Sequence, residues 1–471
     1  MMPIENITVS LHPLDYGLIG LYIVLLVIVG FRFARSKLEN TEDYLLAGRT
    51  LTLPGFVATL VTTWYGGILG VGEFAYQYGL SAWIVFGMPY YVFAAFFAFF
   101  MAKKVRETNL YTIPDRIYEY YDRKTGLLSA FFTFLMVSPA PYILMVAVLI
   151  NLLFQWGMLT SILIGTLFSM IYVYLGGFRS VIRTDYLQFG LMFAGFLLIV
   201  LIALNEYGGL AFLRQHLPEQ HLSWHGGNSL QYILVWFFIA IWTLVDPGFH
   251  QRCYGAKSGK TAKHGILISI GFWGVFDFLT TTTGLYAKAI LPEIPALMSY
   301  PLLAEELLPP VIKGLFYVGL IAVIMSTIDS FSFLSAVTLG RDFFWRLSGD
   351  DSEAKVNFYT QIGLILTGVI AILMVVAIPS VIDLWYTIGT LFIPALIFPL
   401  VSTYLSKRII NANYAFAITL LGFSTSATWY ILGMMNTSGG WPQYPMGIEP
   451  LYPGLVLGGI IYLAGYFRVK E

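Results

Sequence analysis

Cysteine and charged residues are what this 471-residue chain has least of. Its single cysteine, Cys253, excludes an intrachain disulfide and any cysteine-based metal cluster. Asp, Glu, Lys and Arg make up 11% of the residues, less than half of the roughly 25% that is usual in soluble domains. The six histidines are scattered along the chain, and no cluster of His, Cys and carboxylate residues would support catalysis. An enzyme is therefore disfavoured.

Long apolar runs fill most of the chain, of which 58% is hydrophobic. A membrane-spanning helix needs about 20 apolar residues, and runs of that length recur from end to end. The runs are continuous rather than alternating, so an all-α polytopic membrane protein is favoured over a β-barrel. The first run, residues 14–31, is longer than the apolar region of a signal peptide and precedes its basic residues. We therefore expect it to be a retained span.

Charge, glycine and proline divide the apolar runs into about thirteen expected transmembrane helices. They cover residues 14–34, 53–79, 81–102, 126–156, 158–176, 185–205, 229–250, 264–290, 309–339, 357–377, 381–402, 413–433 and 451–468. With this division, all Lys and Arg except Arg214, Lys288 and Lys313 fall on one side of the membrane. The positive-inside rule makes that side cytoplasmic. We expect the N-terminus outside and the C-terminus in the cytoplasm of a multi-pass cell-membrane protein.

Four aspartates interrupt the apolar runs: Asp185, Asp246, Asp277 and Asp329. A charged residue at the centre of a membrane helix costs about 2.5–3.5 kcal/mol on insertion scales and usually marks an ion or substrate pathway. No Lys or Arg is expected deep within a span, so the predicted countercharge is a mobile cation from solution. For Asp185, which follows Thr184 at an expected helix start, helix capping is the alternative.

The segment IMSTIDS (324–330) places polar residues in the middle of the ninth expected span. Ser326, Asp329 and Ser330 are three and four positions apart and share a helix face, with Thr327 on its flank. Hydroxyl and carboxylate oxygens are ligands for small hard cations, and Na⁺ fits by the same logic. The alternative is that the hydroxyls bond back to carbonyls one turn earlier.

Two expected spans contain helix-breaking residues. The second carries TTWYGG (62–67), and the seventh carries Pro247 directly after Asp246. Interrupted helices at matching positions of two halves indicate the midplane binding site of a transporter. Residues 1–471 are therefore expected to form one transmembrane transporter domain. It comprises a leading helix (14–34), repeat one (53–205), repeat two (229–402) and trailing helices (413–468).

Four blocks of the chain form a recognisable set: DYLLAGRTL (43–51), YTIPDRIYEYY (111–121), GGFRSVIRTDYLQFGLMF (176–193) and IMSTIDSFSFLSAVTLGRDF (324–343). In this order they resemble the recurrent blocks of the sodium/solute symporter family. The resemblance covers about residues 14–410 and implies the LeuT-type fold, a 5+5 inverted repeat with one leading and two trailing helices. It also implies sodium-coupled symport by alternating access, with Na⁺ as the coupling ion and no organic cofactor.

The resemblance also implies two sodium sites. The common site takes backbone carbonyls of Leu60, Thr63 and Val323 and the side chains of Ser326 and Thr327. A possible second cation site joins Asp185 to Asp329 and Ser330. Two-sodium relatives more often have a hydroxyl where Asp329 stands, so the number of sodium ions and a role for protons stay open.

The second-span motif resembles that of the choline-transporter branch, in which a tryptophan helps to box an ammonium group by cation–π contact. The implied substrate residues are Trp64, Tyr65, Tyr90, Tyr142, Trp242 and Asp246. Asp246 replaces an aromatic residue of that branch, and sugar-transporting relatives have a polar residue there. The solute is expected to be an organic cation, amine or zwitterion, with a sugar or polyol as the alternative.

Two other classes of membrane protein compete with a symporter. A passive channel predicts a continuous polar stripe, whereas the polar groups here cluster at a few depths. A membrane sensor is not expected, because no kinase or receiver segment follows Arg468. The expected partners are a small-molecule solute and the lipid bilayer, with no nucleic acid, and the oligomeric state is left open.

Overall fold

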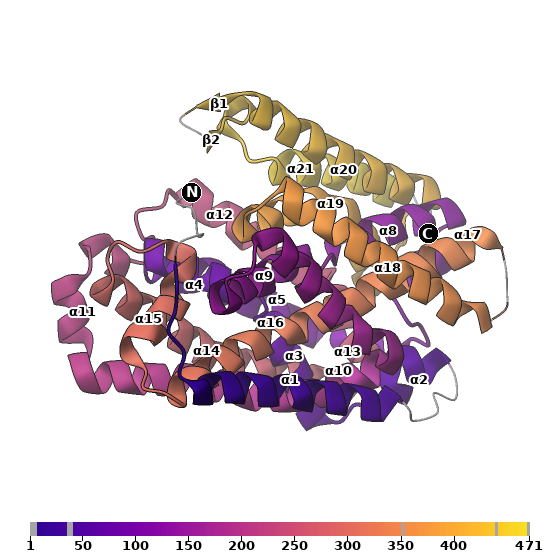
Figure 1. The fold of residues 1–471 in the computed structure, drawn as a ribbon. Coiled ribbons are helices and arrows are strands. Elements are labelled where there is room, and N and C mark those ends of the chain that lie inside the picture. Colours follow the sequence, from indigo (N-terminus) through magenta and orange to yellow (C-terminus); the bar gives the residue numbers. More distant parts are fainter. Residues whose placement is uncertain (1–6, 35–40, 350–351, 353, 439–440, 469–471) are drawn as a thin grey trace.

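A computed structural model describes residues 7–34, 41–349, 352, 354–438 and 441–468 of the chain. Helices form almost all of it (Figure 1). The described part contains nine helices that are long and apolar enough to cross a membrane, and a bent pair makes a tenth. Every expected span coincides with helix in the structure. The all-α membrane fold is confirmed, while thirteen crossings stay a prediction.

The first half of the chain contains the leading helix and the first broken helix. Its helices are α1 (Pro13–Ala34), α2 (Thr41–Leu46), α3 (Leu53–Trp64), α4 (Ile68–Tyr78), α5 (Met88–Phe100), α6 (Ala102–Glu107), α7 (Ile113–Tyr120), α8 (Arg123–Met136), α9 (Ala140–Phe154), α10 (Met158–Tyr207) and α11 (Leu210–His216). A π-helical segment, Trp83–Gly87, leads into α5, and 3-10 turns occupy Ala47–Arg49 and Glu219–Leu222.

The second half contains the second broken helix and the trailing pair. Its helices are α12 (Leu230–Ile239), α13 (Pro247–Gly255), α14 (Gly259–Ile290), α15 (Ser299–Leu307), α16 (Ile312–Val337), α17 (Arg346–Ser348), α18 (Ala354–Ala377), α19 (Val381–Leu405), α20 (Ala412–Met435) and α21 (Leu451–Arg468). The 3-10 turns are Ala240–Leu244, Ala296–Met298 and Pro445–Gly447, and a π-helical segment, Thr338–Trp345, extends α16. Two short strands, β1 (Thr437–Ser438) and β2 (Trp441–Pro442), pair between α20 and α21.

The fifth and sixth expected spans meet at Gly177, where α10 changes direction. Gly177 has φ +55° and ψ −160°, and a Cβ atom there would lie 2.6 Å from the ring of Tyr44. Helix resumes after this glycine, so Asp185 lies about two turns inside the second segment rather than at its start. The capping alternative for Asp185 is therefore wrong, because its carboxylate is in the middle of a helix.

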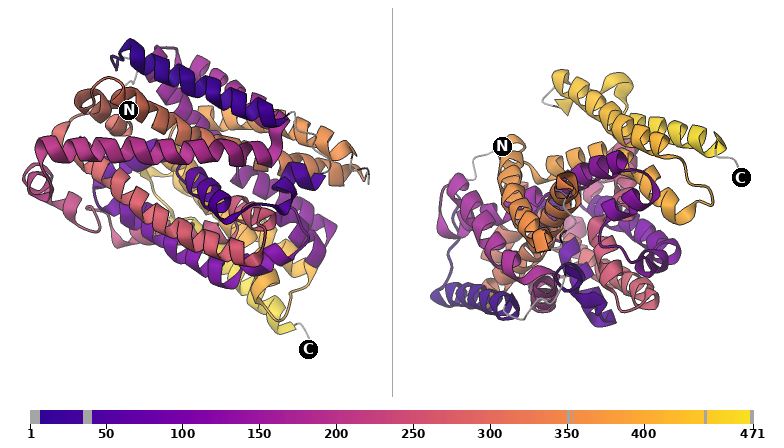
Figure 2. Two further views of the ribbon diagram at one scale, coloured as in Figure 1. Left: turned by 90° about the horizontal axis from the view of Figure 1, so that it is seen from below. Right: turned by 90° about the vertical axis from the view of Figure 1, so that its right-hand side faces the viewer.

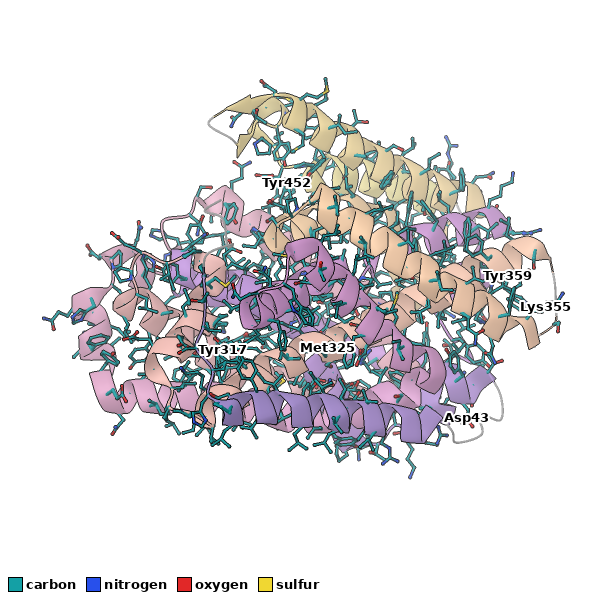
Figure 3. All side chains as sticks on the ribbon, viewed as in Figure 1. Asp43, Tyr317, Met325, Lys355, Tyr359 and Tyr452 are labelled. Atoms are coloured by element: carbon teal, nitrogen blue, oxygen red, sulfur yellow. The ribbon has the colours of Figure 1, made fainter. Side chains whose placement is uncertain are left out.

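Helix α16 is the most enclosed long helix, with 94% of its most apolar window buried. It packs against α1, α3, α9, α10 and α18, and the labelled α16 side chains Tyr317 and Met325 lie within the body of the molecule (Figure 3). Helices α20 and α21 pack on each other and on α19, and they form an outer layer (Figure 2). The polar segment 324–330 is thus in the interior of the protein.

Candidate functional site

The first helix break lies between α3 and α4, whose axes differ by 58°. Residues 65–67 connect the two helices, and glycine is required at two of them. A Cβ atom on Gly66 would lie 2.1 Å from Cβ of Thr327, and one on Gly67 would lie 1.9 Å from the Trp385 ring. The unwound segment thus lies so close to α16 and α19 that no side chain would fit at these two positions.

Three of the residues expected at the common sodium site, Thr63, Val323 and Thr327, meet at this contact. Thr327 Oγ1 lies 2.8 Å from the Thr63 carbonyl oxygen and 3.3 Å from that of Val323. Leu60, one helical turn before Thr63, is buried in the same helix. Ser326 Oγ donates to Asp185 Oδ1 at 2.6 Å. Carbonyl and hydroxyl oxygens of this kind are the donors that a small hard cation prefers, so the residues present fit Na⁺.

The structure corrects the expectation that no basic residue lies deep in a span. The Arg252 side chain is fully buried, and its Nη2 atom donates to Thr63 Oγ1 at 2.7 Å, Ser330 Oγ at 2.9 Å and Thr59 Oγ1 at 3.1 Å. The charge pattern assigned Arg252 to a loop after the seventh span. That assignment fails because α13 begins at Pro247 and carries the chain on as buried helix through Gly255.

Two of the residues expected at the second cation site, Asp185 and Ser330, lie close to this guanidinium group. Thr59 Oγ1 donates to Asp185 Oδ2 and accepts from Arg252. Ser330 Oγ lies 3.0 Å from Thr63 Oγ1 and also accepts from Arg252. Asp329, beside Ser330 on α16, is fully buried. A positive charge that belongs to the chain therefore lies where a second mobile cation was expected.

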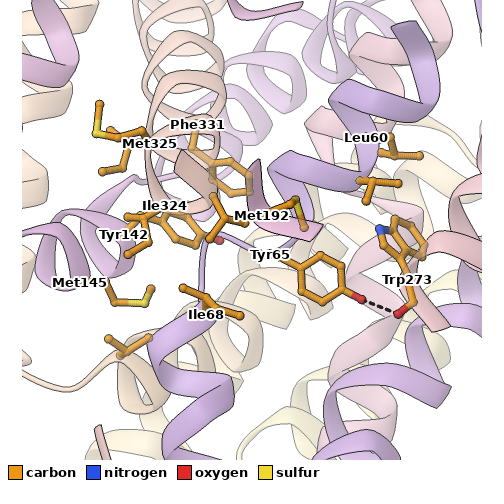
Figure 4. Close-up of a cluster of buried hydrophobic side chains, with 14 of the residues drawn as sticks. Leu60, Tyr65, Ile68, Tyr142, Met145, Met192, Trp273, Ile324, Met325 and Phe331 are labelled. Carbon is orange, nitrogen blue, oxygen red and sulfur yellow. Dashed lines mark hydrogen bonds between the residues drawn. The ribbon is translucent and has the colours of Figure 1, made fainter. Parts of the chain in front are cut away.

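The six expected substrate residues line one cavity of about 90 Å³. The indole of Trp64 lies with its ring centroid 4.9 Å from that of Tyr90, and Tyr142 packs against Phe331 at 5.1 Å. Tyr142 lies on α9 and Tyr65 directly follows α3, and both are among the buried side chains drawn in Figure 4. The lining residues are Thr63, Trp64, Tyr65, Gly67, Val71, Phe86, Tyr90, Tyr142, Trp236, Ile239, Trp242, Asp246, Asp277, Phe331 and Trp385.

Asp246 lies at the second helix break and caps α13. Its Oδ1 atom accepts from the backbone N–H of Phe249 at 2.9 Å, and its Oδ2 atom accepts from Trp242 Nε1 at 3.1 Å. These two bonds fix the carboxylate at the wall of the cavity. Among the residues that line the cavity, Asp246 and Asp277 are acidic and none is Lys, Arg or His, so the cavity suits a positively charged group.

Several residues of this region were not predicted from the sequence. Trp236, Trp385 and Phe331 line the cavity from α12, α19 and α16, and nothing in their local sequence distinguishes them from packing aromatics. Thr59 had a detectable signal, because Thr59 and Thr63 are four residues apart and share a helix face. Both of their hydroxyls accept from Arg252.

Known proteins are similar to this chain over most of its length. Residues 44–422 match the model of the sodium:solute symporter family. The chain belongs to this family. It is 25% identical to a sodium/pantothenate symporter of Haemophilus influenzae (95% of this chain and 96% of the relative). It is 24% identical to the osmoregulated proline transporter OpuE of Bacillus subtilis (94% of each chain). The high-affinity choline transporter 1 of Drosophila melanogaster is 26% identical over 78% of this chain and 63% of the relative.

The fold is shared with solved transporters. A substrate-bound, outward-open Na⁺-coupled sialic acid symporter superimposes with a TM-score of 0.78 at 16% identity, over 97% of both chains. Mhp1, a nucleobase–cation symporter in a closed conformation, gives 0.58 at 13% identity, over 92% of this chain and 97% of its own. The LeuT-type fold is therefore confirmed, and the protein is a membrane transporter rather than an enzyme. Family membership supports sodium-coupled symport of a small solute.

Proposed function

We propose that the protein imports a small organic cation or amine together with sodium, by alternating access. The observation that supports this solute class is the cavity lining, which combines aromatic faces with the Asp246 carboxylate and contains no basic residue. A cation over an aromatic face gains roughly 0.5–2 kcal/mol, more when water is excluded. A carboxylate in the same cavity adds a charge that a positive solute can neutralise.

The cavity chemistry favours an organic cation over the alternatives. A sugar or polyol would bury several hydroxyl groups, each of which needs a hydrogen-bond partner, and most of the lining is apolar or aromatic. A zwitterion would bring a carboxylate close to Asp246. The volume of about 90 Å³ is below the roughly 300–1,000 Å³ of sites for drug-sized ligands, which favours a small solute.

Coupling to sodium is proposed to act through the break between α3 and α4. The Thr63 carbonyl oxygen is expected to bind sodium, and the next residue, Trp64, forms part of the cavity wall. A sodium ion bound at Thr63 and Thr327 would fix the end of α3 and with it the Trp64 indole. Solute held by that indole would stabilise the sodium site in return, because coupling between two sites is reciprocal.

We further propose one sodium ion per cycle. The guanidinium of Arg252 binds hydroxyls of the expected second site, and a second cation there would meet a like charge. At the common site, Arg252 bonds to the hydroxyl of Thr63, whereas the expected sodium ligands are the Thr63 carbonyl oxygen and the Thr327 hydroxyl.

A binding experiment with one variant tests the solute class. Purified protein is screened by thermal shift, with and without sodium, against quaternary amines, amino acids, sugars and polyols. We expect sodium-dependent stabilisation by an amine, and a loss of affinity of about tenfold in Asp246→Asn. Asparagine keeps the helix cap and removes only the charge. A polyol as the sole ligand, or an amine affinity unchanged in Asp246→Asn, would overturn the proposal.

A further inference from the structure

Asp277 is a buried carboxyl group that lines the solute cavity but was expected neither at the sodium sites nor among the solute-binding residues. It lies in the middle of α14 and is 5% exposed. Tyr65 Oη is 2.9 Å from its Oδ1 atom, and the Tyr91 hydroxyl bonds to its Oδ2 atom. No described Lys, Arg or His forms an ion pair with it. Its charge therefore has no fixed partner, whereas the Thr59 hydroxyl links the charge of Asp185 to Arg252.

The number of hydrogen atoms available for the bonds at Tyr65 indicates the protonation state of Asp277. Tyr65 Oη lies 3.0 Å from the Trp273 carbonyl oxygen and 2.9 Å from Asp277 Oδ1 (Figure 4 draws the former contact). One hydroxyl hydrogen cannot serve both acceptors fully. A proton on Oδ1 resolves this, because the carboxylic acid then donates to Tyr65 and Tyr65 donates to the carbonyl. Protonation also removes the cost of an unpaired buried charge.

Among the residues that the structure describes, the hydrogen-bond partners of Asp277 are uncharged. Its nearest titratable neighbours are the phenols of Tyr65 and Tyr91, and Tyr300 on α15 donates to the Thr280 carbonyl oxygen one turn further along α14. The π-helical segment before α5 is close enough that a Cβ atom on Gly87 would lie 2.7 Å from Oδ2. This tight packing suits a proton better than a metal ion, which needs several ligands around it.

Asp277 is also accessible from the solute cavity. It lines that cavity, and it also lines a second, mostly apolar cavity of about 510 Å³ between α11, α14 and the segment around Trp83. It is the residue that the two linings have in common. A proton can therefore reach the carboxyl group from the solute pathway without crossing the sodium site.

We propose that Asp277 is a proton-binding site whose occupancy is coupled to the α3–α4 break through Tyr65. Binding adds one proton to one carboxylate oxygen and forms the neutral acid. Tyr65 is the first residue after α3 and follows Trp64 directly, so the bonds at its hydroxyl help to hold the unwound segment. Loss of the proton leaves one acceptor without its hydrogen and loosens that segment, which lowers sodium affinity at Thr63.

The test uses protons and sodium alone, so it does not depend on the solute class. Acid-minus-base infrared difference spectra of the full chain should contain a carboxylic-acid C=O band that is lost in Asp277→Asn. The band should persist in the control Asp383→Asn, which changes an exposed carboxylate at the start of α19. Tyr65→Phe, which removes a bond to Oδ1, should shift the band to higher frequency. An identical band in Asp277→Asn would overturn the assignment.

Sodium binding supplies the second readout. Intrinsic tryptophan fluorescence reports it, because Trp64 and Trp273 lie beside Tyr65. We expect the sodium affinity of the wild type to fall at least threefold as pH rises through the titration of the infrared band. In Asp277→Asn the affinity should not follow this titration. An equal pH dependence in both proteins would refute coupling even if the band were confirmed. If Asp277→Asn does not fold, a band shift in Tyr91→Phe supports the assignment, and no shift overturns it.

Discussion

Arg252 and Asp185 are joined through one hydroxyl group, that of Thr59, which accepts from the guanidinium and donates to the carboxylate. The three side chains are all fully buried. A buried charge that loses its partner costs about 3–5 kcal/mol, whereas loss of both charges costs much less. The pair therefore stabilises the fold mainly as a unit.

A double-mutant cycle tests this unit. We expect Arg252→Gln to lower the free energy of unfolding by about 3–5 kcal/mol. The double variant Asp185→Asn/Arg252→Gln should lose clearly less than the sum of the two single variants. Chemical denaturation in detergent measures all three, with Lys257→Gln, an exposed site, as the control. Strict additivity would mean that the two charges do not interact.

The common sodium site is tested at its hydroxyl ligand. Thr327→Val keeps the shape of the side chain and removes Oγ1, which lies 2.8 Å from the Thr63 carbonyl oxygen. We expect at least a tenfold loss of sodium affinity, about 1.4 kcal/mol, with near-normal affinity in Thr327→Ser. Sodium-induced thermal stabilisation measures both. Ser326→Ala should also weaken sodium binding. Equal affinity in Thr327→Val and Thr327→Ser would exclude Oγ1 as a ligand.

The proposal of one sodium ion per cycle can be tested separately. Sodium binding by the wild type should follow a Hill coefficient near one, because the Arg252 guanidinium binds hydroxyls of the expected second cation site. A coefficient near two in the wild type would contradict the proposal.

Trp64 is expected to contribute to solute binding much more than to sodium binding. Trp64→Ala removes a cavity wall and should weaken binding of an amine by about tenfold, within the range for a desolvated cation–π contact. Sodium affinity without solute should change far less, and Trp64→Phe should recover part of the loss. Parallel losses of solute and sodium affinity in Trp64→Ala would indicate a purely structural tryptophan.

The close contact at Gly66 predicts a steric effect. An alanine Cβ would lie 2.1 Å from the Thr327 side chain, so Gly66→Ala must push α16 away from the break. Overpacking of this kind costs about 1–3 kcal/mol. We expect a lower melting temperature and a lost sodium response. Gly17→Ala, which has no atom within 4 Å of its added carbon, is the matched control and should behave as the wild type.

Membrane orientation can be tested without a cysteine-free background, because Cys253 is fully buried. We expect an impermeant maleimide to label Trp224→Cys on intact cells and to label Lys257→Cys only after permeabilisation. Both positions are exposed in the structure. The reverse pattern would place the N-terminus in the cytoplasm.

The two helix breaks could be predicted because local sequence determines them, whereas the cavity aromatics were implied by the resemblance to the choline-transporter branch. Paired glycines and an Asp-Pro step interrupt helices wherever they lie, and Trp64 and Tyr90 belong to short motifs. Trp385 could not be predicted as a lining residue, since only the packing of α19 against the first break brings it there. Arg252 was misplaced because the charge pattern treats every arginine near a span end as a loop residue.

The guanidinium of Arg252 has an electrical consequence. In the proposed cycle a sodium ion leaves the protein on the cytoplasmic side, whereas the charge on α13 stays with the chain. A unit charge that crosses the whole membrane exchanges about 2.3 kcal/mol per 100 mV with the membrane potential. Any displacement of Arg252 along the membrane normal would exchange a fraction of that. We therefore expect voltage to act on the return of the empty carrier as well as on sodium entry.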